Sequence, residues 1–582
     1  MNSRIDPPLK TGRRRFLSGT ASAGLGLAAA AALPYAADAT KPSSASSRTG
    51  LAGLDAHPGP KSLATADGAM IVTSHPLATR AGLDVLREGG TACDAVLAAA
   101  MAQLVLEPHM TSITGGLSMM YRDAASGEAT YLNGNINAPL APLPGYSGAD
   151  LYSGRGVPVP GWWPAFEAAR QRWGRVPRAR LMRDAIEFAR DGFPVDPRLF
   201  AGYSGSADNI GTHAQGREAF WPDGYLLMPG KTLKQARVAR TLERLRDEGM
   251  DYYQGDFARA FSAECQRGGG VITPEDFRAY RPMFQRPVQG TYREKWTIVG
   301  SPAPDDGGMM LVEAFNLLEH VDLTKLGPAA QSFETLQWLI RVHNEVYYAP
   351  PRQGDLDSAP EDIAVLLSKE YAAKRFELMS VREPRDTGRI MPTPGTIHIS
   401  AIDKERNVAS CTHSHMAGGW ENGLFAEGFQ LSGGGSFFQR ILPQPGSRAT
   451  VYLAPNIIMQ GDVPVIASGS PSVSLVSCVL QNLVNLMDFG MDVRQSVHQP
   501  RFGARPHNPQ NGWERGNILE CGFSEDIQRQ FTEWAEKRRL WHRLMQPWAS
   551  LTGGFEAVAH DPATGRLSAC ADPRRAGAAE GY

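Results

Sequence analysis

The chain has 582 residues, of which 42% are hydrophobic and 20% charged, and its formal net charge is −1. This composition is that of an ordinary globular protein and excludes a disordered, collagen-like or coiled-coil chain. The balanced charge, without a run of five or six like charges, argues against a nucleic-acid partner. The length suits three or four domains, or one large α/β assembly.

Residues 1–39 have the features of an export signal. Arg13–Leu17 matches the twin-arginine pattern R-R-x-F-L, an alanine-rich stretch follows, and residues 37–39 form a small-residue cleavage site. The apolar stretch is too short and too weak for a stable membrane span. We therefore predict a twin-arginine signal peptide over 1–39, a Ser/Ala/Gly/Pro-rich linker over 40–62, and a periplasmic or secreted mature protein.

The mature chain begins with an α/β pattern and continues into a mostly helical middle. Apolar spacing, glycine stops and turn residues define each predicted element. The predictions are a strand over 71–74, helices over 77–88 and 92–106, a hairpin of 119–122 with 130–133, and helices over 180–191, 233–248, 257–267, 308–319 and 332–348.

The last third returns to strands and glycine-rich loops. We predict a hairpin of 396–403 with 408–412, a strand over 465–468, a helix over 476–489 and a strand over 554–560. No internal repeat is visible at periods of 20–50 residues. Strands at both ends with helices between them indicate one sheet core built from both halves of the chain.

The strand that begins at residue 396 has two contrasting faces. Because side chains alternate along a strand, one face carries Ile397, Ile399 and Ala401 and the other carries Thr396, His398 and Ser400. If residues 404–406 form a three-residue loop, Ser414 lies opposite Thr396 and Thr412 lies opposite His398.

Neither a metal site nor a cofactor site is predicted. The six cysteines form no CxxC pair, and their disulfide pairing stays open. His398, His413 and His415 invite a metal interpretation, but the hairpin register turns His413 to the face away from His398.

Several short motifs occur in a characteristic order from about residue 65 to the end. They are Ser74–Thr79, Glu107–His109 leading into Gly115-Gly116, Val157–Gly161, Thr273–Phe277, Gly395–His398, and Ala571–Arg574 with Gly577–Ala579. Each motif alone is weak. The ordered set, which spans nearly the whole mature chain, resembles the gamma-glutamyltranspeptidase family of N-terminal-nucleophile hydrolases.

The resemblance implies a fold and a maturation step. The fold is a four-layer αββα sandwich, made as an inactive precursor that cleaves itself just before a threonine into two intertwined subunits. The matching bond here is Gly395–Thr396. It would divide the chain into a large subunit of residues 63–395 and a small subunit of residues 396–582.

Cleavage would give Thr396 a base. The α-amine of an N-terminal threonine can take the proton of its own hydroxyl, which an amide nitrogen cannot do. The resemblance assigns Ser414 a supporting hydroxyl, and Thr412 is also a candidate catalytic residue. A plainer interpretation is that Thr396 is only a β-forming residue at a strand start.

An oxyanion hole is also required. The resemblance assigns it to backbone amides of a Gly-Gly turn, which corresponds here to Ser472 and Val473. Valine has less conformational freedom than glycine, which disfavours the same turn at position 473.

The residues that would bind a γ-glutamyl group depart from the family pattern. Asn135 stands where the family has an arginine for the substrate carboxylate, and asparagine lacks the charged bidentate fork. Residues 432–438 lack the acidic partner of the substrate amine, and Val451-Tyr452 replace paired serines. If another cation replaces the arginine, Arg122 and Arg440 are the first candidates.

Two functions follow from these residues. The first is a self-processing amidohydrolase or acyltransferase with an altered glutamyl pocket, acting on a small-molecule amide or peptide. The alternative is a non-catalytic periplasmic binding relative of the family. Retention of Gly395, Thr396, Thr412 and Ser414 favours the enzyme.

Overall fold

The computed structural model describes residues 57–348, 360–381, 395–505 and 516–582. The predicted signal peptide and residues 40–56 of the predicted linker lie outside these ranges. The rest of the linker is held by the C-terminal third of the chain. The Gly59 N–H donates to the carbonyl of Pro573 at 2.8 Å, and the Lys61 N–H donates to Nε2 of His498 at 3.1 Å.

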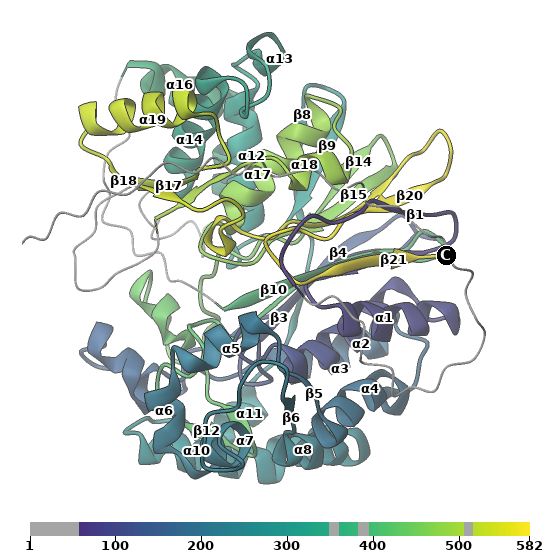
Figure 1. Cartoon of the computed structure of the whole chain (residues 1–582), viewed down its shortest axis with the longest axis vertical. Helices are drawn as coiled ribbons and strands as arrows, with labels where there is room; N and C mark the ends of the chain where they lie inside the picture. Colours follow the sequence, from purple (N-terminus) through teal and green to yellow (C-terminus); the bar gives the residue numbers. More distant parts are fainter. Residues whose placement is uncertain (1–56, 349–359, 382–394, 506–515) are drawn as a thin grey trace, which may run out of the picture. The chain divides into compact units, whose positions relative to one another are not determined.

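Seven antiparallel strands form the first sheet, in the order β21-β2-β10-β11-β3-β4-β7. Figure 1 labels β3, β4, β10 and β21 of this sheet. Four of the seven strands precede residue 395 and three follow it, so both halves of the chain build this sheet, as predicted. The strands are β2 (Met70–Thr73), β3 (Gly116–Arg122), β4 (Ala129–Gly134), β7 (Met283–Gln285), β10 (Thr396–Ile402), β11 (Val408–Ser414) and β21 (Ala578–Gly581).

The second sheet is also antiparallel, in the order β1-β20-β19-β15-β14-β9-β8. Its strands are β1 (Ala64–Ala66), β8 (Val288–Tyr292), β9 (Trp296–Gly300), β14 (Asn456–Gln460), β15 (Val463–Gly469), β19 (Glu556–His560) and β20 (Leu567–Ala569). The residues had indicated a single sheet core. They form two sheets because alternation identifies a strand but not the strand it pairs with.

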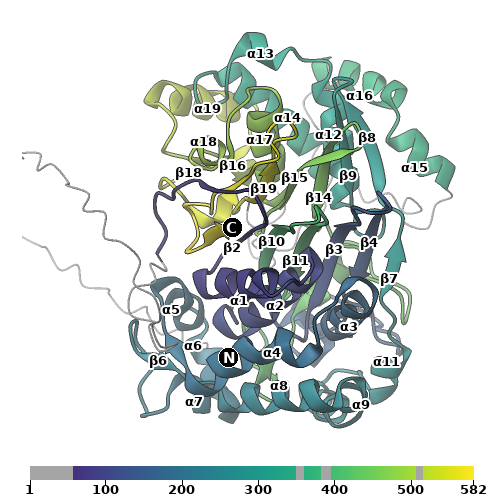
Figure 2. The same cartoon turned by 90° about the vertical axis from the view of Figure 1, so that its right-hand side faces the viewer.

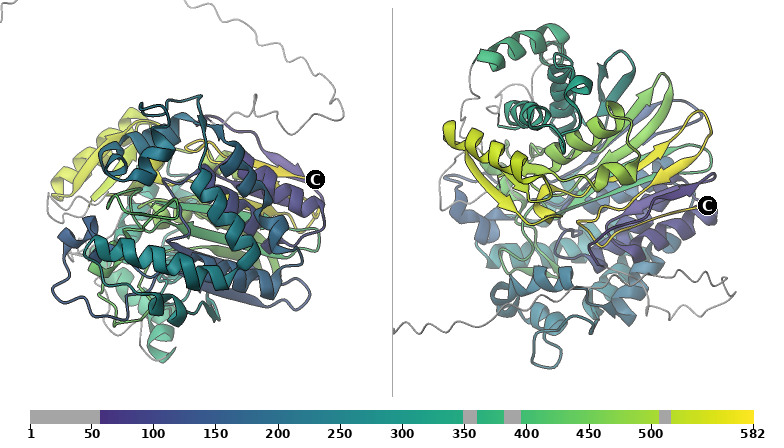
Figure 3. Two further views of the ribbon diagram at one scale, coloured as in Figure 1. Left: turned by 90° about the horizontal axis from the view of Figure 1, so that it is seen from below. Right: turned by 45° about the horizontal axis from the view of Figure 1, so that its top comes forward.

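Helices cover the outer faces of the two sheets, while the inner faces pack on each other through β10, β11, β15 and β19. Against the first sheet lie α1 (Pro76–Arg87), α2 (Ala92–Leu106) and α3 (Trp162–Trp173), as Figure 2 shows. Against the second lie α12 (Gly307–Leu318) and α17 (Leu475–Met487), with α14 (Phe333–Tyr347) packed on both (Figure 3). The predicted αββα order is therefore confirmed.

The remaining elements surround these four layers. No helix within the described ranges is both long enough and apolar enough to cross a membrane. The further helices are α4 (Arg178–Asp191), α5 (Pro197–Ser204), α6 (Ala207–Thr212), α7 (Ala214–Phe220), α8 (Ala236–Glu248), α9 (Met250–Tyr252), α10 (Ala258–Arg267), α11 (Pro274–Ala279), α13 (Leu323–Leu326), α15 (Pro360–Leu366), α16 (Lys369–Val381), α18 (Val493–Val497) and α19 (Glu525–Lys537). The short strands are β5 (Phe193–Pro194), β6 (Thr232–Leu233), β12 (Phe425–Ala426), β13 (Phe429–Gln430), β16 (Phe502–Ala504), β17 (Gly516–Glu520) and β18 (Trp541–Met545).

Helix α2 has the predicted bounds, and every one of its residues is buried. Thr91 and Asp94 cap its start reciprocally, through bonds of 3.2 and 3.0 Å to each other's backbone N–H groups. Helix α8, by contrast, begins at Ala236 and not at residue 233. Leu233 instead pairs with Phe193 in a two-stranded sheet, a long-range contact that local apolar spacing cannot reveal.

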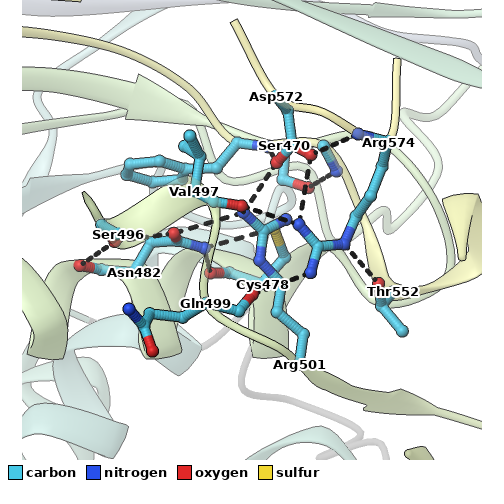
Figure 4. Close-up of polar contacts among 12 residues, drawn as sticks. Ser470, Cys478, Asn482, Ser496, Val497, Gln499, Arg501, Thr552, Asp572 and Arg574 are labelled. Carbon is cyan, nitrogen blue, oxygen red and sulfur yellow. Dashed lines mark hydrogen bonds and ion pairs between the residues drawn. The ribbon is translucent and has the colours of Figure 1, made fainter. Parts of the chain in front are cut away.

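A buried ion cluster ties the C-terminal tail to the second sheet (Figure 4). Asp572 pairs with Arg501 at 2.7 Å and with Arg574 at 3.3 Å, and Arg574 pairs with Glu520 at 2.6 Å. Burial opposes ionisation, but the two arginines hold the pKa of Asp572 below its usual range. Asp572 also accepts the Phe555 N–H at 2.8 Å, one residue before β19.

Replacing Arg574 with methionine should destabilise the protein by about 3–5 kcal/mol, because Glu520 and part of the charge on Asp572 lose their buried partner. The measurement is the midpoint of urea unfolding. The matched control is Arg529→Met, whose partner Asp526 is 63% exposed. That variant should change stability by less than about 1 kcal/mol. Equal effects of the two substitutions would contradict a structural role for the cluster.

Candidate active site

Thr396 is the first residue of β10, and the observed register matches the prediction. Thr396 pairs with Ser414, and His398 pairs with Thr412. Ile399 and Ala401 join the apolar core formed with α1 and α2. Thr396 and His398 are on the opposite side of β10, which faces the second sheet, where Gly469 of β15 contacts the His398 ring.

The Gly395–Thr396 peptide is held on both sides. The Gly395 N–H donates to the Ala417 carbonyl at 2.5 Å, and the Gly395 carbonyl accepts the His415 N–H at 3.1 Å. A Cβ atom at position 395 would lie 2.8 Å from the carbonyl oxygen of Ala417 and 3.0 Å from that of His109. Glycine is therefore required by the close approach of the surrounding backbone.

Ser414 connects the threonine hydroxyl to the carbonyl of Gly395. The Ser414 hydroxyl donates to the Gly395 carbonyl at 2.5 Å and accepts the Met416 N–H at 2.8 Å. Its oxygen also lies 3.0 Å from Oγ1 of Thr396. Since the Ser414 proton is committed to Gly395, the Thr396 hydroxyl is the donor in this third bond.

Thr412 belongs to the next row of the sheet and does not bond to Thr396. Its hydroxyl lies 2.8 Å from Nδ1 of His398, whose Nε2 lies 3.0 Å from the Ser400 hydroxyl. Burial lowers the pKa of His398 to about 3, so the ring is neutral. Thr412 thus makes no contact with Thr396 that would support the prediction that Thr412 is catalytic. Its hydroxyl orients the His398 ring instead.

His413 points the other way, as its position in the strand predicted. Its Nδ1 lies 2.9 Å from the Thr111 hydroxyl and its Nε2 lies 2.9 Å from Oε1 of Gln103 on α2. Across the described ranges, no group of three or more His, Cys, Asp or Glu side chains could hold a metal ion.

The turn that follows β15 contains the two predicted oxyanion residues. Ser472 has φ of +86°, which favours glycine, so the strained position is Ser472 and not Val473. The Ser472 hydroxyl donates to the Leu551 carbonyl at 2.9 Å, and the Val473 carbonyl accepts the Tyr347 hydroxyl at 2.8 Å. Among the described residues, the backbone N–H groups of Ser472 and Val473 donate to no acceptor, and the turn makes no hydrogen bond to Thr396.

Asn135 follows the last residue of β4 and lies next to Gly116, which pairs with Ser414, the partner of Thr396. Three strand spacings separate it from the threonine, or about 14 Å. Its side-chain amide donates to Asp305 at 2.5 Å and to Ser118 at 2.8 Å. Asn135 is therefore engaged by neighbouring side chains, and no contact joins it to the nucleophile.

Asp305 is a buried acid that the sequence did not single out. It accepts hydrogen bonds from Tyr131, Asn135 and Ser118. Burial raises the pKa of Asp305 to about 7. Its position in a Pro-Asp-Asp-Gly-Gly turn predicts only a loop, so no local signal could have identified it.

Apolar side chains occupy the region that would bind a glutamyl amine. Phe437, Val451 and Tyr452 are fully buried in one apolar cluster. Arg440 is paired with Asp306 at 2.6 Å. Arg122 is at the far end of β3, opposite Val408, about 20 Å from Gly116. Arg122 is therefore excluded as a replacement for the missing arginine, and Arg440 already has a carboxylate partner.

Two further buried acids lie near the start of β10. Glu107 accepts the Ser74 hydroxyl at 2.7 Å and the Gln103 amide at 3.1 Å. Glu556 bonds through its backbone carbonyl to the Ser400 hydroxyl at 3.0 Å, and its carboxylate oxygens have no hydrogen-bond partner among the described residues. Burial raises the pKa of both carboxyl groups. Glu107 was noted only as part of a motif, and Glu556 was missed.

Comparisons with known proteins identify relatives over most of the chain. The family model described as Gamma-glutamyltranspeptidase matches residues 78–582. The chain is 26% identical to a glutathione hydrolase proenzyme of Bacillus subtilis strain 168, covering 88% of this chain and 91% of that protein. It is 27% identical to an acylase ACY 1 proenzyme of Pseudomonas sp. strain SE83, covering 86% of this chain and 91% of that protein.

The fold of this chain is also found in a solved structure. A cephalosporin acylase from Bacillus halodurans superimposes with a TM-score of 0.75 and 24% identity, covering 90% of this chain and 98% of that one. The αββα sandwich is thus of the N-terminal-nucleophile hydrolase type. Together with the family match over more than four fifths of its length, these findings show that the chain belongs to the gamma-glutamyltranspeptidase family.

Proposed function

We propose that this protein is a gamma-glutamyltransferase-like amidohydrolase that cleaves itself at Gly395–Thr396 and then uses Thr396 as an N-terminal nucleophile. The observation that carries the proposal is the chain of contacts from the Thr396 hydroxyl to Ser414 and on to the Gly395 carbonyl. The relatives of this chain include hydrolase and acylase proenzymes, which supports the same class of reaction.

In the cleavage step, Oγ1 of Thr396 attacks the carbonyl carbon of Gly395. The hydroxyl proton passes to Ser414, which delivers its own proton to the carbonyl oxygen, so the ring intermediate is neutral. The His415 N–H, 3.1 Å from that oxygen, stabilises the developing charge. The C–N bond then breaks as the hydroxyl proton of the intermediate passes to the nitrogen, which frees the Thr396 α-amine and leaves an ester between the Gly395 carbonyl carbon and Oγ1 of Thr396. Water hydrolyses this ester to a Gly395 carboxylate and the Thr396 hydroxyl.

In the turnover step, the free α-amine accepts the Thr396 hydroxyl proton as the oxygen attacks a substrate amide. The amine of the substrate leaves with a proton, and an acyl-enzyme remains. Water or a second amine then removes the acyl group. The unengaged N–H groups of Ser472 and Val473 are the proposed oxyanion donors in this step.

The proposed substrate carries an acyl group other than γ-glutamyl. Asn135 is engaged by Asp305, and Phe437, Val451 and Tyr452 supply apolar surface. The nearby Arg448 already donates to the backbone carbonyls of Asn135 and Arg281, both at 2.6 Å, and residues 432–438 offer no acid to a substrate ammonium. A neutral or apolar acyl group suits such a pocket better.

Export through the twin-arginine route and a two-subunit mature form are part of the proposal. Both sheets combine strands from either side of residue 395. The pieces 63–395 and 396–582 would therefore remain intertwined after cleavage, because separating them would break both sheets.

Purified mature protein should separate on a denaturing gel into pieces of residues 40–395 and 396–582, that is 356 and 187 residues. Thr396→Ala should stay whole, because it lacks the attacking oxygen, whereas Thr396→Ser should still cleave. Amino-terminal sequencing of the small piece checks the site. A start at any other residue would sink the assignment, and an uncut wild-type chain would favour the binding-protein alternative.

Ser414→Ala should slow self-cleavage by about 10²–10³-fold, since it removes the hydroxyl that relays the proton from Thr396 to the Gly395 carbonyl oxygen. Ser414→Thr keeps the hydroxyl and should cleave at a rate within about tenfold of wild type. The measurement is the time course of cleavage after rapid dilution of freshly expressed precursor. Wild-type kinetics in Ser414→Ala would contradict the relay.

Processed enzyme should hydrolyse neutral acyl anilides with a kcat/KM about 10²–10⁴-fold above that for a γ-glutamyl anilide, because the glutamyl charges would be buried unpaired. Steady-state assays on protein confirmed as cleaved provide the comparison. A γ-glutamyl kcat/KM of about 10⁶ M⁻¹s⁻¹ or more would overturn the substrate class but not the nucleophile.

A further inference from the structure

A cavity of about 450 Å³ lies between α7, the start of α8 and the β12–β13 hairpin. About half of the residues that line it are apolar, among them the buried Phe220, Trp420 and Phe429. The rings of Phe220 and Trp420 meet edge to face with centroids 5.3 Å apart. The volume is within the range of sites that bind small organic molecules.

The polar side chains of the wall are mostly engaged by the protein itself. The Gln215 amide oxygen accepts the Gly428 N–H at 2.7 Å, and the Gln430 amide oxygen accepts the Trp420 N–H at 2.5 Å. The Gln235 amide donates to the Val105 carbonyl at 2.8 Å. The inner wall therefore offers a ligand mainly apolar contacts.

The rim of the cavity carries more positive than negative charge. Arg237 on the rim is paired with Glu218 at 2.5 Å. Lys231 and Lys234 are exposed and form no ion pair within the described ranges, and Asp223 is the remaining acid of the lining. These five side chains have a net charge of +1, which favours an anionic ligand.

The start of α8 adds to this preference. Residues 236–238 line the cavity, and the N-cap Gln235 makes no side-chain capping bond. In the described part of the chain, the first three backbone N–H groups of α8 donate to no acceptor. A helix start of this kind favours negative charge.

The cavity is separate from the candidate active site. Thr111 lines it and bonds to His413, which is on the helix-covered face of β11. Thr396 is on the opposite face of the same sheet, towards the second sheet. A ligand in the cavity would thus not contact the nucleophile.

We infer that this cavity binds an amphipathic organic anion, with an aromatic or acyl body against Phe220, Trp420 and Phe429 and its anionic group between Lys231 and Lys234. The apolar wall favours an aromatic or acyl body in the ligand. The two lysines, which form no ion pair within the described ranges, and the start of α8 favour a negatively charged group on it. This inference does not depend on the proposed catalytic function.

Two fluorescent probes with nearly the same aromatic framework test both halves of the inference. 8-Anilino-1-naphthalenesulfonate carries a sulfonate, and N-phenyl-1-naphthylamine lacks it. Fluorescence titration of the full chain should give one saturable site for the sulfonate. Lys231→Ala/Lys234→Ala should weaken that site about tenfold and leave the neutral probe within twofold. The control Lys295→Ala/Lys325→Ala, which also removes two exposed lysines, should change neither.

Ala219→Trp, which adds an indole at a lining position, should abolish the saturable site for both probes. Its thermal midpoint should match that of wild type. Sulfonate binding that survives in this folded variant would overturn the cavity as the site. Equal sulfonate affinity in wild type and in the Lys231→Ala/Lys234→Ala variant would overturn the inference that the lysines bind an anionic group. If Ala219→Trp does not fold, the comparison of wild type with this double variant is the test of the inference.

Discussion

The pairing of β10 with β11 is the constraint on which the candidate site depends. It sets Thr396 opposite Ser414 and turns both toward the second sheet. A slip of one residue would move Thr396 to the helix-covered face, because side chains alternate along a strand. Neighbouring strands β2 and β3 extend the same register, so the position of one hydroxyl is fixed by a whole sheet and not by a local turn.

The space between the two sheets contains an apolar core and, around Thr396, a polar site. The groups of the polar site are hydroxyls, a neutral imidazole and carboxyl groups, all removed from water. Such groups are costly to bury unless they are hydrogen-bonded. His398 meets this requirement through Thr412 and Ser400, and burial keeps its ring neutral. The result is a hydrogen-bonded set of side chains next to Thr396 that carries no net charge.

Family membership and substrate class rest on different residues. The proposed cleavage chemistry would use Gly395, Thr396 and Ser414, whose contacts are short and mutually consistent. The proposed recognition of an acyl group would use side chains from several other segments. Asn135 bonds to Asp305, and Phe437 packs near Tyr452 with ring centroids 5.6 Å apart. The scaffold that sets up the nucleophile is thus compatible with a different acyl pocket.

The sequence by itself determined the strand at Thr396, its two faces, its register with β11 and the bounds of α2, because these follow from alternation, loop length and apolar spacing. The family resemblance, in turn, predicted that Asn135 stands where the family has an arginine. Only the tertiary structure decided that the strands form two sheets, that Thr412 contacts His398, and that Arg122 lies about 20 Å along β3 from Gly116. It alone revealed Asp305 and Glu556. Those facts depend on contacts between residues far apart in the chain, and local periodicity contains no information about such partners.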